Sequence, residues 1–218
     1  MKNLPLKVDL HVHTCYSADG VTTLKEVVAY SKKRGLDGVA ITDHDILSGA
    51  TILAKRSDLL IIPGVEVTTQ RGHVLALGIT APISTNLSPS ETVQQIRKSG
   101  GIAVAAHPIG LLKGMEPRTI ITSHFDAIEV INSVAFPFYF SVYMGRKLAT
   151  QLGLPQVAGS DSHYALEIGA AYTLIEADPQ VDEVIQAIKK GATTPVGKPI
   201  PWKVRPRGEA FKLKRKYE

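Results

Sequence analysis

Residues 7–13 read KVDLHVH, a short β-rich run that ends in two histidines with one residue between them. Side chains alternate along a strand, so His11 and His13 are expected to point to the same side. A pair of this kind occurs in metal sites, and also in structural or surface positions. The run therefore predicts a strand whose carboxyl end is the first candidate for a functional site.

After residue 13 the chain alternates similar β-rich runs with helical stretches, a pattern typical of a parallel α/β fold. The expected strands are 7–13, 37–43, 59–67, 73–79, 101–106, 126–131, 156–160 and 171–176. The expected helices are 22–34, 88–99, 138–152 and one with Asp178 as N-cap and Pro179 in first position that runs to Lys190. This succession favours a compact, distorted α/β barrel. An open doubly wound sheet is the alternative, although the glycine-rich loops GxGxxG and GxxxxGK[ST] of nucleotide-binding sheets are absent from the sequence.

The positive charge of the chain is concentrated at its carboxyl end. The 218 residues include 25 lysines and arginines against 20 acidic residues, a net charge of +5. Residues 1–200 are balanced, so the excess lies in 201–218. We expect one domain over 1–200 and a basic tail over 201–218, with loop structure after Gly191 where proline and glycine are dense. Such a tail is either a solvated terminus or a segment that binds nucleic acid.

Cysteine content and hydropathy bear on the cellular location. Cys15 is the only cysteine, which excludes an internal disulfide and fits a reducing cytoplasm. The amino end lacks the apolar run of a signal peptide. The longest apolar stretches, such as 59–65 and 101–106, are far shorter than the ~20 residues that cross a membrane. We expect a cytoplasmic protein with no membrane partner.

Histidines and acidic residues gather at the ends of the expected strands. They are His11, His13, Asp19, His44, Glu66, His73, His107, Asp161 and His163. The carboxyl ends of barrel strands converge on one face, so these residues are expected to form one cluster. Taken singly, each has an ordinary explanation as a packed histidine or an ion-pair partner. Their joint placement instead indicates a metal site, and imidazole with carboxylate suits zinc, manganese or iron.

Five motifs in this order resemble those of the PHP (polymerase and histidinol phosphatase) superfamily. They are DLHVHTCYSADG from Asp9, AITDHD from Ala40, GVEVT from Gly64 with the later His73, AHP from Ala106 and GSDSH from Gly159. The resemblance spans residues 8–163. It implies a distorted (β/α)7 TIM-like barrel with a metal cleft at the carboxyl rim of the strands. It also implies a small stand-alone metal-dependent phosphoesterase.

The same resemblance implies three divalent ions, of zinc, manganese or iron. The first would be held by His11, His13, Glu66 and Asp161, the second by Glu66, His73 and His107, and the third by Asp19, His44 and His163. Glu66 is the best candidate for a bridging carboxylate, because it is the acid between the two histidine groups that need joining. A water bridging two metals would attack the phosphate as hydroxide. The catalytic residues on this interpretation are Glu66, Asp161 and His107.

Three functions are compatible with these motifs. The favoured one is hydrolysis of a phosphate ester of a small metabolite or nucleotide. The alternative is a nuclease or other nucleic-acid-processing enzyme that uses the same metals and binds the polyanion through the basic tail. A non-catalytic interaction subunit is the third, and the full ligand set argues against it, because structural sites seldom need three metals with open positions.

Several other polar residues have secondary roles in this interpretation. Asp43 and Asp45 flank His44, and either could orient a histidine, while Asp45 could equally cap a following helix. Asn132 ends an expected strand and is a possible contact of the substrate or of a ligand. His124 is assigned a surface or structural role, and Cys15 a packing role.

Overall fold

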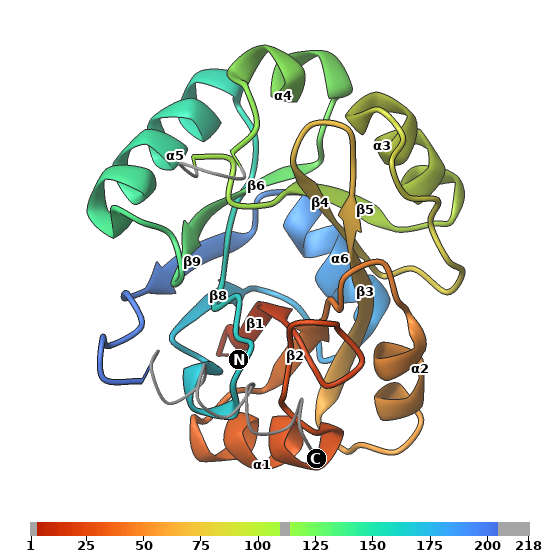
Figure 1. Cartoon of the computed structure of the whole chain (residues 1–218), viewed down its shortest axis with the longest axis vertical. Coiled ribbons are helices and arrows are strands. Elements are labelled where there is room, and N and C mark those ends of the chain that lie inside the picture. The colour runs from red at the N-terminus through yellow and green to blue at the C-terminus, as the bar shows by residue number, and fades with distance from the viewer. Residues whose placement is uncertain (1–3, 110–113, 205–218) are drawn as a thin grey trace.

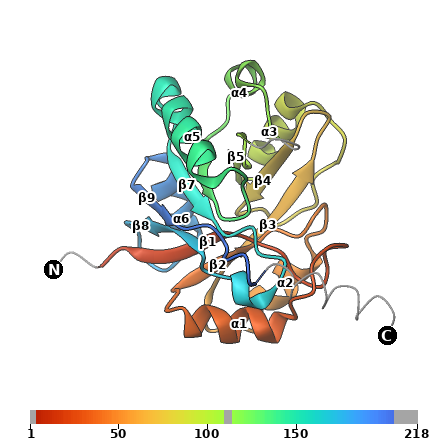
Figure 2. The ribbon, with the colours of Figure 1, turned by 60° about the vertical axis from the view of Figure 1, so that its left-hand side comes forward.

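The computed structural model describes residues 4–109 and 114–204, and within them nine strands form one sheet in the order β7-β6-β5-β4-β3-β2-β1-β8-β9. The strands are β1 (Leu6–Val12), β2 (Gly38–Ile41), β3 (Leu60–Thr68), β4 (His73–Leu77), β5 (Ile102–Ala105), β6 (Ala127–Asn132), β7 (Gln156–Gly159), β8 (Ala171–Ile175) and β9 (Thr193–Gly197). The sheet, shown in Figure 1, curves until β7 contacts β8 and β9, so its two edges meet (β7 is labelled in Figure 2). The predicted TIM-like α/β barrel is confirmed.

Two strands run against the others. β4 is antiparallel to both β3 and β5, and β8 is antiparallel to both β1 and β9, so the remaining seven strands share one direction. Six strands expected from the sequence therefore follow the expected parallel pattern, and the seventh of this direction, β9, lies in a segment expected to be loop. Because β4 is reversed, His73 at its first residue lies beside Thr68 at the last residue of β3. The reversal explains how a histidine that begins a strand reaches the rim where other strands end.

In the described parts of the chain, five α-helices pack outside the sheet, and a sixth closes one end of it. The helices are α1 (Leu24–Lys33), α2 (Ser48–Ala54), α3 (Pro89–Lys98), α4 (Pro117–Ser123), α5 (Phe138–Leu152) and α6 (Val181–Lys189). In two views α1 and α5 lie on opposite sides of the strands (Figure 1, Figure 2). Within the described parts of the chain, no helix combines the length and hydropathy needed to cross a bilayer.

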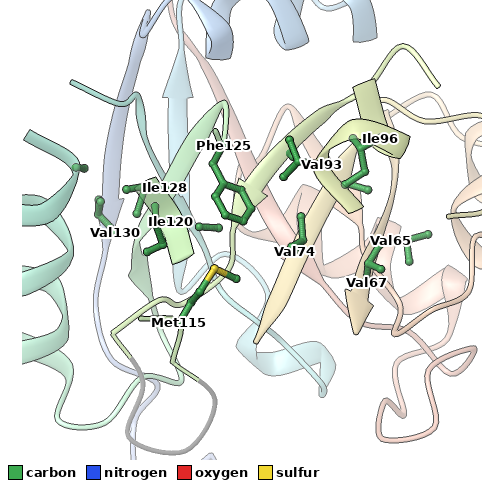
Figure 3. Packing of buried hydrophobic residues seen from close by; sticks show 14 of the residues in the cluster. Val65, Val67, Val74, Val93, Ile96, Met115, Ile120, Phe125, Ile128 and Val130 are labelled. Carbon is green, nitrogen blue, oxygen red and sulfur yellow. The ribbon is translucent and has the colours of Figure 1, made fainter. Parts of the chain in front are cut away.

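The outer core lies between the sheet and these peripheral helices. Val93 and Ile96 of α3 lie on the side of this cluster where the valines of β3 and β4 are, and Ile120 of α4 lies beside Ile128 and Val130 of β6, as Figure 3 shows. Thr23 and Ser88 begin α1 and α3 as reciprocal capping boxes, since each hydroxyl accepts the amide of a glutamate three residues later. These caps satisfy amides that a helix start leaves unpaired, and they fix two helices where the sequence predicted them.

α6 seals the barrel at the end opposite the rim of histidines. Val184, Ile185 and Ile188 belong to the same buried cluster as Val8 and Leu77, which lie near the amino ends of the parallel strands. Its approach is close, because a Cβ on Gly78, whose φ is +73°, would stand 2.8 Å from Ile185 Cγ1. Only the opposite end of the barrel is therefore left for a functional cleft.

The structure corrects the sequence analysis at three places. α6 begins at Val181 with Gln180 as N-cap, so Asp178 and Pro179 precede the helix rather than start it. Residues 193–197, expected to be loop, form the edge strand β9, where Pro195 is tolerated because an edge needs fewer ladder bonds. α2 and α4 were not predicted, since both are short. Most of the proposed tail, 205–218, lies outside the described residues.

Bulges in β1 and β6 turn polar side chains into the barrel. Asp9 pairs with Val39 and Val12 with Ile41, so β1 carries one more residue than β2 between these pairs. Leu10 consequently packs in the interior cluster while Val12 packs in the outer cluster beneath α1. β6 has a similar irregularity after Glu129. Each bulge changes which face the following residues occupy, just before the strand reaches the rim.

Candidate metal centre

All nine histidines and acids singled out in the sequence lie at the carboxyl rim of the parallel strands. They come from the end of β1 and the loop after it (His11, His13, Asp19), the loop after β2 (His44), β3 (Glu66), the start of β4 (His73), and the segments after β5 (His107) and β7 (Asp161, His163). Strand twist and barrel closure bring positions separated by some 150 residues of chain into contact. The expected single cluster is therefore present.

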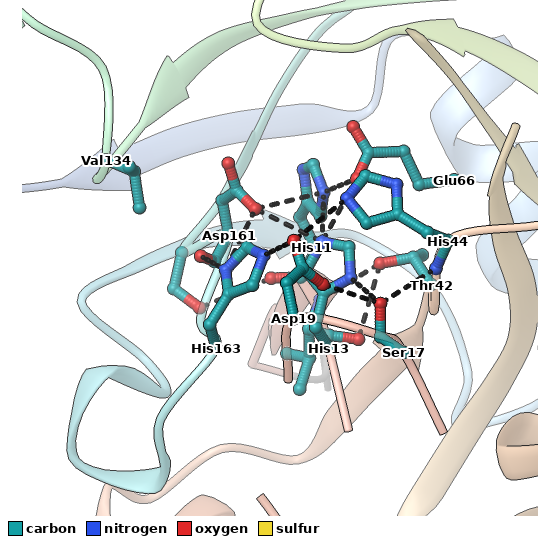
Figure 4. Close-up of polar contacts among 12 residues, drawn as sticks. His11, His13, Ser17, Asp19, Thr42, His44, Glu66, Val134, Asp161 and His163 are labelled. Atoms are coloured by element: carbon teal, nitrogen blue, oxygen red, sulfur yellow. Dashed lines mark hydrogen bonds and ion pairs between the residues drawn. The ribbon is translucent and has the colours of Figure 1, made fainter. Parts of the chain in front are cut away.

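Glu66 is the centre of this cluster and is only 1% exposed. Its Oε1 lies 2.8 Å from His73 Nδ1 and 2.9 Å from His107 Nε2. Its Oε2 lies 3.0 Å from His13 Nε2, 3.1 Å from His11 Nε2 and 3.4 Å from His44 Nδ1 (Figure 4). One carboxylate thus faces five imidazoles, and its two oxygens contact different histidines.

Asp161 and Asp19 complete the other side of the cluster. Asp161 Oδ1 lies 3.2 Å from His13 Nε2 and 3.4 Å from His11 Nε2. Asp19 Oδ2 lies 3.0 Å from His163 Nε2 and 3.4 Å from His44 Nε2. The rings of His13 and His163 are stacked with centroids 4.2 Å apart, which joins the two halves.

Ligand atoms converge in three groups in which every atom lies within 4.8 Å of the others. The groups are His11, His13, Glu66 and Asp161; His13, Asp19, His44 and His163; and His44, Glu66 and His73. The first has the composition expected from the sequence. The second adds His13 to the expected trio, and the third contains His44 beside Glu66 and His73, while His107 reaches the Glu66 oxygen that His73 also contacts. Carboxylate oxygens and imidazole nitrogens at these separations suit divalent ions.

Burial and opposite charges act against each other on these groups. Burial alone would raise the pKa of Glu66, but His11 and hydrogen bonds from His107, His11 and His13 hold it well below its usual value. Burial likewise lowers the pKa of His13, yet hydrogen bonds to Asp161 and Glu66 raise it to about 9. In the metal-free protein Glu66 is therefore ionised and His13 is protonated at neutral pH.

We expect the metal-free protein to lose stability between about pH 6.5 and pH 9. The pKa of His13 is about 9 in the folded chain against 6.5 in a model compound, so its protonation stabilises the fold fully below 6.5 and this contribution disappears as the pH rises through 9. The thermal midpoint of chelator-treated protein should fall across this range, and less so in His13→Gln. A midpoint that stays constant would contradict the assignment.

Glu129 is a functional residue that sequence reasoning did not select. Its Oε1 lies 3.0 Å from His11 Nδ1, and its Oε2 accepts the backbone amide of His107 at 2.8 Å and the Asn132 amide at 3.1 Å. Asn132 Nδ2 also lies 3.1 Å from Asp161 Oδ2, which agrees with its expected contact role. Glu129 thus orients two histidines of the cluster from behind. The available signal was a lone acid in the apolar strand IEVIN.

Glu129→Gln should weaken metal binding and activity by about 10- to 100-fold, because a neutral amide orients His11 less firmly and removes charge behind the imidazole. Metal affinity can be measured by competition with a chromophoric chelator. Asp126→Asn, which alters a carboxylate that directly precedes β6 and pairs with Arg97, is the control. Equal metal affinity in the Glu129 and Asp126 variants would contradict a positioning role.

The backbone around the site is held in unusual conformations. His107 and Asp161 have φ of +28° and +54°, in a region that residues other than glycine rarely adopt. Asp161 is fixed there by its amide, which donates to His11 O at 2.8 Å. Nearby, Asp9 accepts the amides of Ser160 and Gly169, and burial raises its pKa to about 6. Strain of about 1–3 kcal/mol per residue is typical of functional positions.

The other polar residues discussed from the sequence have partly different contacts from those expected. Asp43 accepts the amide and hydroxyl of Thr14 instead of contacting a histidine, and Asp45 accepts the amide of Thr68 and caps no helix. His124 ends α4 away from the cluster, as expected. Cys15 is exposed and does not fill the packing role assigned to it.

The sequence and the structure of this chain were compared with those of known proteins. A family model described as PHP-associated matches residues 143–193. An uncharacterised protein of Methanocaldococcus jannaschii is 33% identical over 142 residues, which cover 59% of this chain and 82% of that protein. A two-domain protein from Bacteroides vulgatus, containing a predicted PHP-like metal-dependent phosphoesterase, has a TM-score of 0.73 at 17% identity over 88% of this chain and 65% of its own. The chain belongs to the PHP superfamily.

A nuclease also has a similar barrel. The lesion-specific endonuclease of Pyrococcus furiosus matches 87% of this PHP chain and 57% of its own length, with a TM-score of 0.64 at 18% identity. At such identities the likeness describes the fold. The PHP-associated match begins at residue 143 and contains Asp161 and His163. The other seven candidate ligands precede it in the sequence.

Proposed function

We propose that this PHP protein is a metal-dependent phosphoesterase that hydrolyses a phosphate ester of a small metabolite or nucleotide at a trinuclear centre. The observation that carries the proposal is the sharing of residues between ligand groups, because Glu66, His13 and His44 each belong to two of the three. Adjacent ions joined by shared ligands are suited to phosphoester chemistry. A structural ion would need one closed set of four ligands.

The donor set fits zinc, manganese or iron as divalent ions. His11, His13, Glu66 and Asp161 would hold one, Asp19, His44 and His163 a second, and His73 and His107 with Glu66 a third. When bound, the ions supply positive charge for the phosphate and lower the pKa of a coordinated water toward neutrality. Imidazoles are neutral ligands, so three carboxylates leave such a centre positively charged and selective for anions.

The protein's own groups would provide the remaining organisation. Glu66 would link two ligand groups through its two oxygens, and Asp161 would be held in place by the Asn132 amide at 3.1 Å. His107 would be fixed through its backbone, whose amide donates to Glu129. Ser17 Oγ donates to Asp19 Oδ1 at 2.8 Å and so orients the most exposed carboxylate. We assign catalysis to Glu66, Asp161 and His107 on this basis.

A nuclease or other nucleic-acid-processing enzyme is the second candidate, favoured by the basic segment 201–218. In its described part, Trp202 is 76% exposed and Lys203 Nζ lies 5.7 Å from the centre of its ring. Exposed aromatic and cationic groups of this type bind single-stranded nucleic acid. A reducing cytoplasm, where we propose the enzyme acts, suits a chain with one exposed cysteine.

A substrate panel tests both candidates. p-Nitrophenyl phosphate, bis(p-nitrophenyl) phosphate and short RNA and DNA are supplied with Mn²⁺ or Zn²⁺ to the full chain and to a version ending at Ile200. Monoester hydrolysis that truncation leaves unchanged would support the metabolite enzyme. Cleavage of oligonucleotides that depends on the tail and falls with salt would support the nuclease. Absence of all hydrolysis by the metal-loaded protein would overturn both.

A further inference from the structure

Ser17 is a buried serine whose hydroxyl lies between three of the candidate metal ligands. It stands in the loop after β1, two residues before Asp19, and is 3% exposed. Its Oγ lies 2.8 Å from Asp19 Oδ1, 3.2 Å from the backbone nitrogen of His44 and 3.4 Å from His13 Nδ1 (Figure 4). A serine hydroxyl has one donor and two acceptor positions, so these three contacts use all of them.

The three residues that Ser17 contacts belong to one group of converging ligands. The group consists of His13, Asp19, His44 and His163, and is named the Asp19 group. Its fourth member, His163, places Nε2 3.0 Å from Asp19 Oδ2, the carboxylate oxygen that Ser17 does not contact. Ser17 therefore touches three members of the group directly and the fourth through Asp19.

The chemistry of its partners fixes the direction of each hydrogen bond at Ser17. The backbone amide of His44 can only donate, and an ionised carboxylate can only accept. Ser17 therefore accepts from His44 and donates its single proton to Asp19. The proton of the third contact must then be on His13 Nδ1, which donates to the remaining lone pair of Ser17 Oγ. A proton on Nδ1 leaves the lone pair of Nε2 free for a metal ion.

Nε2 is also the nitrogen of His13 that faces other candidate ligands. It lies 3.0 Å from Glu66 Oε2 and 3.2 Å from Asp161 Oδ1. Without a proton on His13 Nδ1, the Ser17 hydroxyl would turn to that nitrogen, and Asp19 Oδ1 would lose its donor. The hydroxyl thus ties the proton position of His13 to the orientation of Asp19.

The loop holds Ser17 on both sides of its backbone. The amide of Ser17 donates to Thr14 O at 3.0 Å, and the amide of Gly20 donates to Ser17 O at 3.2 Å. The loop is tight at Gly20, because a Cβ there would overlap Thr14 O. Thr14 is anchored in turn by its hydroxyl, which donates to Asp43 Oδ2 at 2.8 Å. A residue fixed in this way presents its hydroxyl in one direction, as the support of a ligand requires.

We propose that Ser17 is a positioning residue for the Asp19 group, which keeps the proton of His13 on Nδ1 and directs Asp19 toward the ion that this group would hold. The proposal rests on the metal-dependent function proposed for the rim. The first ligand group contains His11, Glu66 and Asp161 besides His13. The Ser17 hydroxyl contacts none of those three in the described structure, so an ion there should depend on it far less.

The test measures Zn²⁺ binding to the full-length protein, by competition with a chromophoric chelator, in Ser17→Ala and Ser162→Ala. Both variants remove one buried hydroxyl at the rim, but among the described residues the hydroxyl of Ser162 has no hydrogen-bond partner. Ser17→Ala should weaken one Zn²⁺ ion by about 10- to 100-fold and the others by less than about threefold. Ser162→Ala should leave every affinity unchanged.

A double variant assigns the weakened ion to the Asp19 group. His163 belongs to this group alone, so adding Ser17→Ala to His163→Ala should cost less than about twofold further. This non-additivity distinguishes a positioning residue from a general disturbance of the rim, whose effects would add.

A second pair of variants separates the hydroxyl from its volume. Ser17→Thr and Ser17→Val have the same shape, but only threonine keeps the hydroxyl, so it should bind the affected ion about tenfold more tightly than the valine variant. In NMR spectra of the Zn²⁺-loaded protein, the Nδ1 proton of His13 is assigned by its absence from His13→Gln. Its signal should shift upfield in Ser17→Val relative to Ser17→Thr, because its hydrogen bond is lost.

Three results would overturn the role of Ser17: equal Zn²⁺ affinities in Ser17→Ala and Ser162→Ala, equal weakening of every ion, or additive losses in the double variant. Thermal melting of each variant verifies its fold. None of these measurements depends on hydrolysis. A protein that bound Zn²⁺ as expected but cleaved no ester would therefore overturn the phosphoesterase function and support the role of Ser17.

Discussion

Glu66→Ala should reduce phosphoesterase activity by more than about 100-fold, because this one carboxylate faces five imidazoles and belongs to two ligand groups. Loss of a residue that merely orients a ligand already costs about 10- to 100-fold, so loss of a shared ligand should exceed that range. The measurement is kcat/KM with p-nitrophenyl phosphate at saturating Mn²⁺ or Zn²⁺, together with metal content per chain.

Two further variants make this result specific. Glu66→Gln keeps the shape of the side chain but removes its charge, so it should also be inactive. Asp58→Asn changes an exposed carboxylate that pairs with Lys32 far from the rim, and it should retain full activity. A Glu66→Ala protein that kept its activity while folded would show that catalysis occurs elsewhere.

Exhaustive chelation should abolish hydrolysis, and restoring a divalent ion should recover it. Up to three ions per chain are expected, one for each group of converging ligands. An ion that binds only the folded chain stabilises it by about 4 kcal/mol at a thousandfold excess over its Kd, so the thermal midpoint should rise when metal is added back. The readouts are activity, metal analysis and calorimetry on one preparation.

Controls for this experiment come from the same cluster. His163→Ala removes a ligand candidate from only one group and should lower the number of bound ions without unfolding the chain. Full activity after verified removal of all metal would contradict a metal-dependent mechanism. Unchanged melting on addition of Mn²⁺, Zn²⁺ and Fe²⁺ would contradict binding at the rim.

The fold was largely predictable because its signals are local. Apolar runs, the Thr23 and Ser88 capping boxes and Gly153 after α5 locate most strands and three helices. Strand direction was not predictable, since reversal of β4 and β8 depends on how distant strands pair. β9 was missed because Pro195 argues against a strand except at an edge, and only the assembled sheet shows that an edge is there.

The candidate site was also predictable only in part. Imidazoles and carboxylates at strand ends are visible in the sequence, and the structure brings all nine together. The role of Glu129 was not visible, because a bulge in β6 places it on the same side as Asn132, three residues later. The sharing of His13 and His44 between ligand groups also depends on side-chain geometry across the rim, which motif spacing does not encode.

The packing of α6 has a consequence for biosynthesis. Val184 and Ile188 complete a cluster begun by Val8 and Leu10, so the barrel interior cannot close until translation has passed Ile188. A nascent chain would hold its histidine-rich rim in an open, half-formed sheet until then. Contacts so distant in sequence make folding slow and leave apolar strands exposed to aggregation. Among the helices that the structure describes, α6 is the one furthest along the chain, so the interior cluster is completed late in synthesis.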